Sequence, residues 1–161
     1  MRRRSSTTDA TPMKELISYR LHVVANLLSR GAELRYRREF GVSLWEWRTL
    51  ALLGDAAEPL SLNHLAHAAG IHKSQMSRVV SGLARRGLVL READEADARG
   101  VRLALTGRGR KAYAGLIRAA SERNESFRSC LSANEHAVFE RALAKLAGRA
   151  RDMIHGEKEI K

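Results

Sequence analysis

The 161-residue sequence predicts a mainly α-helical fold in which a helix-turn-helix is followed by a short β-hairpin. Two segments with helical apolar spacing, 62–69 and 73–86, flank a turn that begins at Gly70 and indicate the helix-turn-helix. Two strand-like runs, 88–91 and 101–105, flank a polar loop and indicate the hairpin. Together these observations predict a winged helix-turn-helix.

A long amphipathic helix is expected before this module, over residues 12–39. Its apolar residues recur at helical spacing along one side. Thr11 can cap the first turn, Pro12 suits the first helical position, and Gly41 ends the helix.

Capping residues predict where the helices inside the module begin. Ser43 and Glu46 have the spacing of a capping box, which opens a helix that runs to about Leu53. Ser61 caps the next helix in the same way. Ser61 therefore marks the start of the first helix of the helix-turn-helix.

Two more helices are expected after the hairpin. Thr106 can cap a helix that runs to about Ser129, and Ser132 with Glu135 forms a second capping box that opens the last helix. The flanking helices carry apolar stripes too long for so small a module to cover. We therefore expect them to pack against the same helices of a second copy, as long N- and C-terminal dimerisation helices.

These elements divide the chain into five expected segments. They are a disordered basic arm (1–11), an N-terminal dimerisation helix (12–42), the winged helix-turn-helix DNA-binding domain (43–105), the C-terminal dimerisation helices (106–155) and a charged tail (156–161).

Charge and cysteine content favour a nucleic-acid partner inside the cell. The net charge is +11, and the segment 70–111 alone carries ten basic and four acidic residues. The single cysteine excludes an intrachain disulfide and fits a reducing compartment. No apolar run approaches the ~18 residues of a membrane span, and the start lacks the apolar region of a secretory signal. We expect a cytoplasmic protein without a membrane partner.

The segment 73–86 is the expected recognition helix. Gln75 suits the edge of adenine and Arg78 the edge of guanine in a major groove. Arg99, at the hairpin tip, can enter a minor groove, and Asp97 can hold its guanidinium in place. The alternative is that these are ordinary surface residues and a surface ion pair. The expected DNA-binding residues are Lys73, Ser74, Gln75, Ser77, Arg78, Asp97, Arg99 and Arg102.

Several of these residues resemble the signature of the MarR family of bacterial transcription regulators. The matching residues are Leu65-Ala66, Gly70, Ser74, Ser77-Arg78, Leu83, Arg86-Gly87-Leu88-Val89, Asp97-x-Arg99, Leu103-x-Leu105-Thr106 and Gly109. The resemblance spans about 16–154. It implies an obligate homodimer that binds a palindromic double-stranded operator, usually represses, and releases DNA when a small, often aromatic, carboxylic acid binds. His72 stands where many members have Ser or Thr. This is a departure from the family pattern, since histidine caps a helix poorly.

The resemblance also implies an effector site. Positions that line such sites fall on Arg30, Trp47 and Arg78, and Trp45 and Arg48 are adjacent candidates. A guanidinium can pair a carboxylate and an indole can cover a ring. The alternative is that the tryptophans belong to the core and Arg30 to a dimer salt bridge.

Other function classes have weaker support. A non-specific architectural DNA binder would not need base-reading residues such as Gln75. A metal-responsive regulator could use His64 and His67, but nothing nearby completes a metal site. A redox-responsive regulator could use Cys130. No phosphate-binding loop or nucleophile–base pair indicates an enzyme, and no cofactor or metal is expected.

Overall fold

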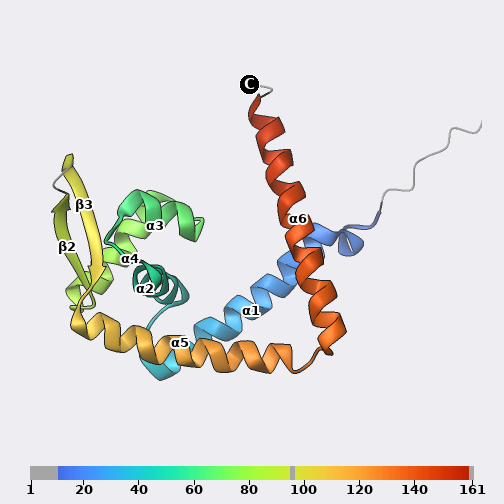
Figure 1. Ribbon diagram of the computed structural model, residues 1–161, viewed down its shortest axis with the longest axis horizontal. Coiled ribbons are helices and arrows are strands. Elements are labelled where there is room, and N and C mark those ends of the chain that lie inside the picture. The colour runs from blue at the N-terminus through green and yellow to red at the C-terminus, as the bar shows by residue number, and fades with distance from the viewer. Residues whose placement is uncertain (1–10, 95–96, 160–161) are drawn as a thin grey trace, which may run out of the picture. The chain divides into compact units, whose positions relative to one another are not determined.

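The computed structural model describes residues 11–94 and 97–159, and the chain divides between Leu116 and Ile117 into two compact units (Figure 1). Residues 1–10 of the expected arm (1–11) and the final residues 160–161 lie outside this description. The first unit contains η1 (Met13–Glu15), α1 (Ile17–Phe40), α2 (Leu44–Asp55), β1 (Leu60–Ser61), α3 (Leu62–Ala69), α4 (Lys73–Arg85), β2 (Val89–Asp94), β3 (Asp97–Leu105) and the start of α5 (Gly107–Arg128). The second contains the rest of α5 and α6 (Ala133–Glu159). The mainly helical winged helix-turn-helix is confirmed.

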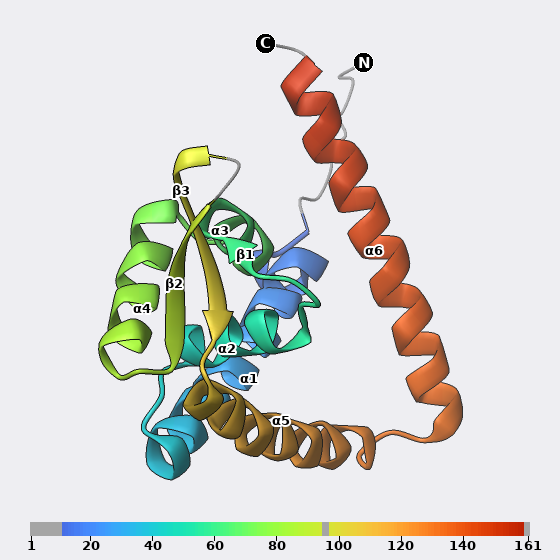
Figure 2. The ribbon, with the colours of Figure 1, turned by 60° about the vertical axis from the view of Figure 1, so that its left-hand side comes forward.

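The sheet is small and antiparallel, with the strand order β1-β3-β2. β2 and β3 form the hairpin, in which Val89 pairs with Leu105, and α4 lies beside β2 (Figure 2). Both strands are longer than expected from the sequence. β1 was not expected, because two residues give no readable alternation; Leu60 pairs with Leu103 at the open edge of β3.

The capped helix starts are confirmed in their hydrogen bonds. The hydroxyl of Ser43 accepts from the amide of Glu46, whose carboxylate accepts in return from the Ser43 amide at 2.7 Å. Thr106 Oγ1 accepts from the amide of Gly109 at 2.9 Å. The last described helix begins with the capping box of Ser132 and Glu135. The hydroxyl and the amide of Ser132 both donate to the Glu135 carboxylate, and these bonds lower the pKa of that carboxyl.

The expected start of the first long helix and the expected end of the last helix are wrong. Pro12 precedes η1 with ψ of 139°, and Leu16 is extended, so α1 begins at Ile17 without a side-chain cap. The cap assigned to Thr11 therefore does not form. α6 continues to Glu159, past the tail expected from Gly156, because one glycine among good helix formers weakens a helix without stopping it.

One core joins α2, α3, α4 and the sheet. Its fully buried side chains include Leu50, Leu65, Met76, Leu83 and Leu103. No helix within the described residues is long and apolar enough to cross a membrane.

The start of α5 lies very close to Leu88, the residue directly before β2. A Cβ added to Gly109 would lie 2.0 Å from the carbonyl oxygen of Leu88. Only a residue without a side chain fits there, so Gly109 allows α5 to leave the sheet at this point.

Candidate nucleic-acid interface

The turn between α3 and α4 is formed by a left-handed glycine. Gly70 has φ of 68°, and its amide donates to the carbonyl of His67 at 3.1 Å. The next amide, of Ile71, donates to Ala66 at 3.0 Å. These bonds satisfy the last carbonyls of α3 and turn the chain into α4.

One side of α4 is fixed in the core. Met76, Val80 and Leu83 are fully buried, and Val79 beside them is half-buried. Thr49 of α2 lies against this side, with its Oγ1 3.5 Å from Met76 Sδ. The orientation of α4 about its axis is therefore set by its apolar side.

The opposite side of α4 presents the expected reading residues. In the first two turns of α4, the exposed candidates are Lys73, Ser74, Gln75 and Arg78. Ser77 is half-buried. His72 is extended and makes no side-chain capping bond. The first turn of α4 thus projects polar and basic groups that are available to a groove.

The wing is formed by β2 and β3, but its tip is only partly described. β3 begins at Asp97, which pairs with Asp94 after a register shift that follows Ala93. The side chains of Asp97 and Arg99 lie outside the description, as do residues 95–96. Their roles remain predictions.

Arg102 is less free than the sequence suggested. Its side chain is 37% exposed, and its Nη2 lies 3.8 Å from Oε2 of Glu58. Both border a hollow of about 570 Å³ between the end of α2, the loop to β1 and His64. A phosphate would therefore compete with Glu58 for this guanidinium.

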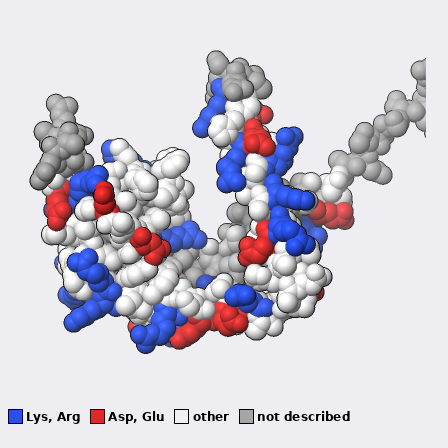
Figure 3. Space-filling view, viewed as in Figure 1, with Lys and Arg blue, Asp and Glu red and all other residues white. Residues whose placement is uncertain are grey.

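Basic side chains are not confined to α4. Figure 3 shows Lys and Arg on the winged helix and, in the second unit, along much of the visible face of α6. Acidic groups are interspersed on both, so each unit has a mixed surface with a basic excess.

Comparison with known proteins finds similarity to one family. Residues 40–100 match the model of the MarR family. The structure of a MarR family transcriptional regulator, SPO1453 from Silicibacter pomeroyi DSS-3, is 28% identical with a TM-score of 0.75, covering 87% of this chain and 98% of that chain. The match covers the winged helix-turn-helix, and the fold of the chain is that of MarR-type structures. Members of this family are transcriptional regulators and not enzymes.

Two further MarR-type structures share the fold at lower identity. A MarR/EmrR family regulator from Acinetobacter sp. ADP1 is 22% identical with a TM-score of 0.78, covering 88% of this chain and 99% of that one. The MepR–DNA complex of S. aureus is also 22% identical, with a TM-score of 0.76 and coverages of 83% and 98%. Among curated proteins, none matches this sequence.

The MarR-type effector candidates separate into two groups. Trp47 is 9% exposed and packs against Tyr36, with ring centroids 5.4 Å apart. Trp47 and Arg48 border a hollow of about 310 Å³ between α2 and α3, with apolar neighbours and Asp55. Trp45 lies outside that lining, beneath the Arg48 guanidinium at 4.8 Å. Arg30 and Arg78 are exposed and are not among the lining residues.

The metal and redox candidates gain no partners. Within 11–94 and 97–159, no three His, Cys, Asp or Glu side chains are grouped to hold a metal ion. Cys130 is exposed, and its Sγ donates to the carbonyl of Phe127 at 2.9 Å.

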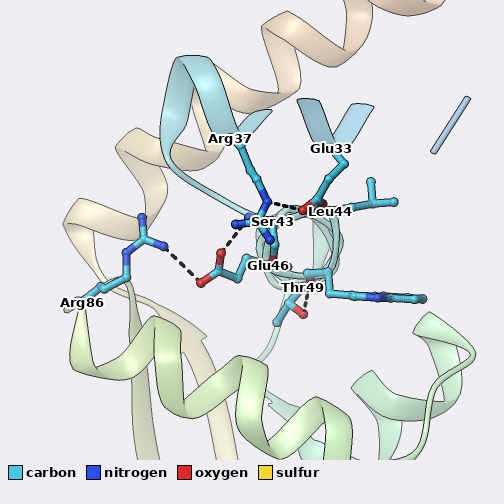
Figure 4. A network of polar contacts seen from close by, with 8 residues as sticks. Glu33, Arg37, Ser43, Leu44, Glu46, Thr49 and Arg86 are labelled. Atoms are coloured by element: carbon cyan, nitrogen blue, oxygen red, sulfur yellow. Dashed lines mark hydrogen bonds and ion pairs between the residues drawn. The ribbon is translucent and has the colours of Figure 1, made fainter. Parts of the chain in front are cut away.

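Sequence reasoning missed a polar network at the N-terminus of α2 (Figure 4). Glu33 of α1 accepts a hydrogen bond from the amide of Leu44 and pairs with Arg37. Burial raises the pKa of Glu33, but the bonds from Leu44 and Arg37 outweigh it and hold that pKa below its usual value. Glu46, already in the capping box, also pairs with Arg86 at 3.1 Å. The capping box was readable from spacing, whereas the partners Glu33 and Arg86 are distant in sequence and gave no signal.

Proposed function

We propose that this chain is a homodimeric, sequence-specific repressor that leaves a palindromic operator when a small aromatic carboxylic acid binds. The observation that carries the proposal is the two-sided α4. Its buried side fixes its orientation, and its exposed side presents Gln75 and Arg78, whose groups suit base edges. We expect it to act on nucleoid DNA in a bacterial cytoplasm.

Exposed apolar side chains support the dimer. In α1, Ile17, Val24 and Leu27 are 51–67% exposed. In α6 of the second unit, Val138, Met153 and others are similarly uncovered. Contiguous apolar stripes of this kind mark protein contacts, and a two-fold dimer would present two α4 helices to successive major grooves.

The hollow beside Trp47 supports an effector that carries both a ring and a charge. Arg48 offers a guanidinium for a carboxylate, and Trp47 with alanines offers an apolar wall. An acid bound here would release DNA only if the DNA-incompetent state binds it better. DNA must then weaken acid binding by the same factor.

The test is fluorescence anisotropy on duplexes tiled from the gene's upstream region, measured over a range of salt and against a scrambled duplex. Retained binding to one palindromic tile in the presence of competitor DNA supports the proposal. Equal and steeply salt-dependent binding to every duplex would mean that only phosphates are read, and the architectural alternative would replace it.

Arg78→Ala and Arg85→Ala form a matched pair, because both are exposed arginines on the same side of α4, seven residues apart. Arg78→Ala should weaken operator binding by roughly tenfold or more and leave scrambled binding less affected. Arg85→Ala should weaken both duplexes alike, as loss of a phosphate contact does. Arg99→Ala is expected to weaken operator binding at least about tenfold with the dimer intact.

The effector site is best tested at Arg48, because Trp47 is buried and its loss would leave a cavity. Arg48→Gln should reduce the response to hydroxylated benzoates and leave operator affinity unchanged. Loss of operator affinity with an unchanged response would remove Arg48 from the effector site.

A further inference from the structure

The carboxylate of Glu46 connects the beginning of α2 to the end of α4 (Figure 4). Its Oε2 accepts from the amide of Ser43 at 2.7 Å, and its Oε1 lies 3.1 Å from Nη1 of Arg86. Arg86 is the C-cap residue of α4. One side chain is therefore held by its own helix while it holds the end of the recognition helix.

Gly82 of α4 lies next to the Glu46 carboxylate. A Cβ added to Gly82 would lie 3.8 Å from Oε1 of Glu46, which is ordinary contact distance. The carboxylate thus lies directly against α4 and is 19% exposed. The ion pair is shielded on the side of the helix and open on the side of Arg86, whose side chain is 40% exposed.

The two ends of α4 are secured differently. At the N-terminal end, the side chain of His72 makes no capping hydrogen bond to the first turn of α4, which we call the reading turn. The ion pair is at the C-terminal end, one helix length away. That length is roughly 20 Å for 13 residues. A tilt of about 3° at the anchored end displaces the reading turn by about 1 Å.

We propose that Glu46 and Arg86 are positioning residues that set the tilt of α4 and thereby the operator preference, without touching DNA themselves. The inference rests on the proposed reading role of α4. Glu46 holds the guanidinium of Arg86, which fixes the end of the helix, and the buried side of α4 transmits that position to Gln75 and Arg78 at the other end.

Glu33 extends the same arrangement to α1. Its carboxylate accepts from the amide of Leu44, so the C-terminal half of α1 and the end of α4 are both bound to the first turn of α2. A displacement of α1 therefore reaches α4 through α2. This gives the proposed dimer helix a physical connection to the reading turn.

Glu46→Gln tests the proposal by the sign of its effect. Glutamine keeps the capping box and the size of the side chain but removes the ion pair. Removal of an acidic charge from a DNA-binding protein should by itself tighten binding to any duplex. Positioning predicts the opposite for the operator. We expect operator affinity to fall about tenfold and scrambled-duplex affinity to stay equal or rise.

Glu15→Gln is the matched control, because it removes the same charge from the exposed turn η1, outside α4. It should leave the ratio of operator to scrambled affinity unchanged. Arg86→Gln should lower that ratio as Glu46→Gln does, Arg86→Lys should restore most of it, and the double variant should be no worse than either single one. All are measured well below the melting temperature, so lost stability alone does not move the ratio.

Two outcomes would overturn the proposal. The first is a Glu46→Gln variant that binds the operator as tightly as the parent chain. The second is an Arg86→Gln variant that loses affinity equally for both duplexes with a salt slope smaller by about 0.9, which identifies a direct phosphate contact. If the parent chain itself shows no operator preference, the proposed function fails separately. Positioning is then decided by amide exchange in the second turn of α4 of the free protein, where the amides are bonded within the helix. Glu46→Gln must accelerate exchange there, and an unchanged rate refutes the proposal.

Discussion

The winged helix and the long helix α1 are stabilised in different ways, although both are rich in apolar residues. α2 buries Trp47, Leu50 and Leu53 within 12 residues, whereas the 24 residues of α1 bury only Ala32 and Tyr36, near its end. The winged helix therefore has a core of its own. Within the described residues of its own unit, most of the apolar stripe of α1 is exposed. The winged helix is therefore stabilised by its own core, whereas we expect α1 to be covered by another protein surface.

Gly109→Ala should produce the largest effect on stability, because it disturbs packing in the winged helix, which is stabilised by its own core. The added Cβ would meet the Leu88 carbonyl at 2.0 Å, so the backbone of α5 or β2 must move. We expect a loss of about 3 kcal/mol in the free energy of unfolding. Urea denaturation measures it.

Gly107→Ala is the control for this prediction. It makes the same chemical change two residues earlier in α5, where no atom lies within 4 Å of the added Cβ. It should change stability by less than about 0.5 kcal/mol. Equal stability of the two variants would mean that the close approach at Leu88 does not govern how α5 leaves the sheet.

Leu27→Ala tests the uncovered region. Leu27 is 67% exposed, so its truncation should cost the isolated chain little. In a dimer that covers α1, the loss is about 1–2 kcal/mol in each copy, which raises the dimer dissociation constant at least about tenfold. Analytical ultracentrifugation measures the constant.

Leu90→Ala provides the comparison for Leu27→Ala. Leu90 is a leucine on β2 that is 47% exposed, outside the proposed dimer helices. Its truncation should leave the dissociation constant unchanged. An equal response of the two variants, or a monomeric parent chain, would refute the covering of α1 by a second copy.

The same contrast explains which features could be predicted from the sequence. Ser43, Ser61, Thr106 and Ser132 cap helices through residues three positions away, and a contact that local can be read from spacing. The amphipathic α4 was readable for the same reason. Most of the candidate reading residues lie on its exposed side, whereas Ser77 is half-buried, and their role in reading DNA stays a prediction.

The features that were missed depend on distant partners. β1 exists because Leu60 meets Leu103, and two residues carry no pattern of their own. Arg102 was assigned to phosphate because nothing local indicated Glu58, 44 positions earlier in the chain. The start of α1 was misplaced because Thr11 and Pro12 have the composition of a helix start, whereas Leu16 adopts the extended conformation that begins the helix.

Glu33→Gln is the smallest expected effect and tests the contact that connects the two regions. The pKa of Glu33 is lowered in the folded chain, since the Leu44 amide and Arg37 favour the carboxylate over the opposing effect of burial. A carboxyl with a lowered pKa stabilises the fold above its unfolded value of 4.5 and loses that contribution as pH falls through the folded value. Glu33→Gln should therefore cost about 1 kcal/mol at pH 7, as loss of a helix-capping bond does, and the difference should vanish at lower pH.

Glu15→Gln separates this contact from a general effect of charge. Glu15 lies in the exposed η1 turn and carries the same charge, so its replacement should leave the pH dependence of stability unchanged. Thermal unfolding between pH 3 and pH 7 compares the two variants. A pH-independent loss in Glu33→Gln would show that the side chain acts through packing. A loss confined to neutral pH would show that α1 is joined to α2 by the charged carboxylate, and so that the uncovered helix and the self-contained module are coupled through a contact that acid removes.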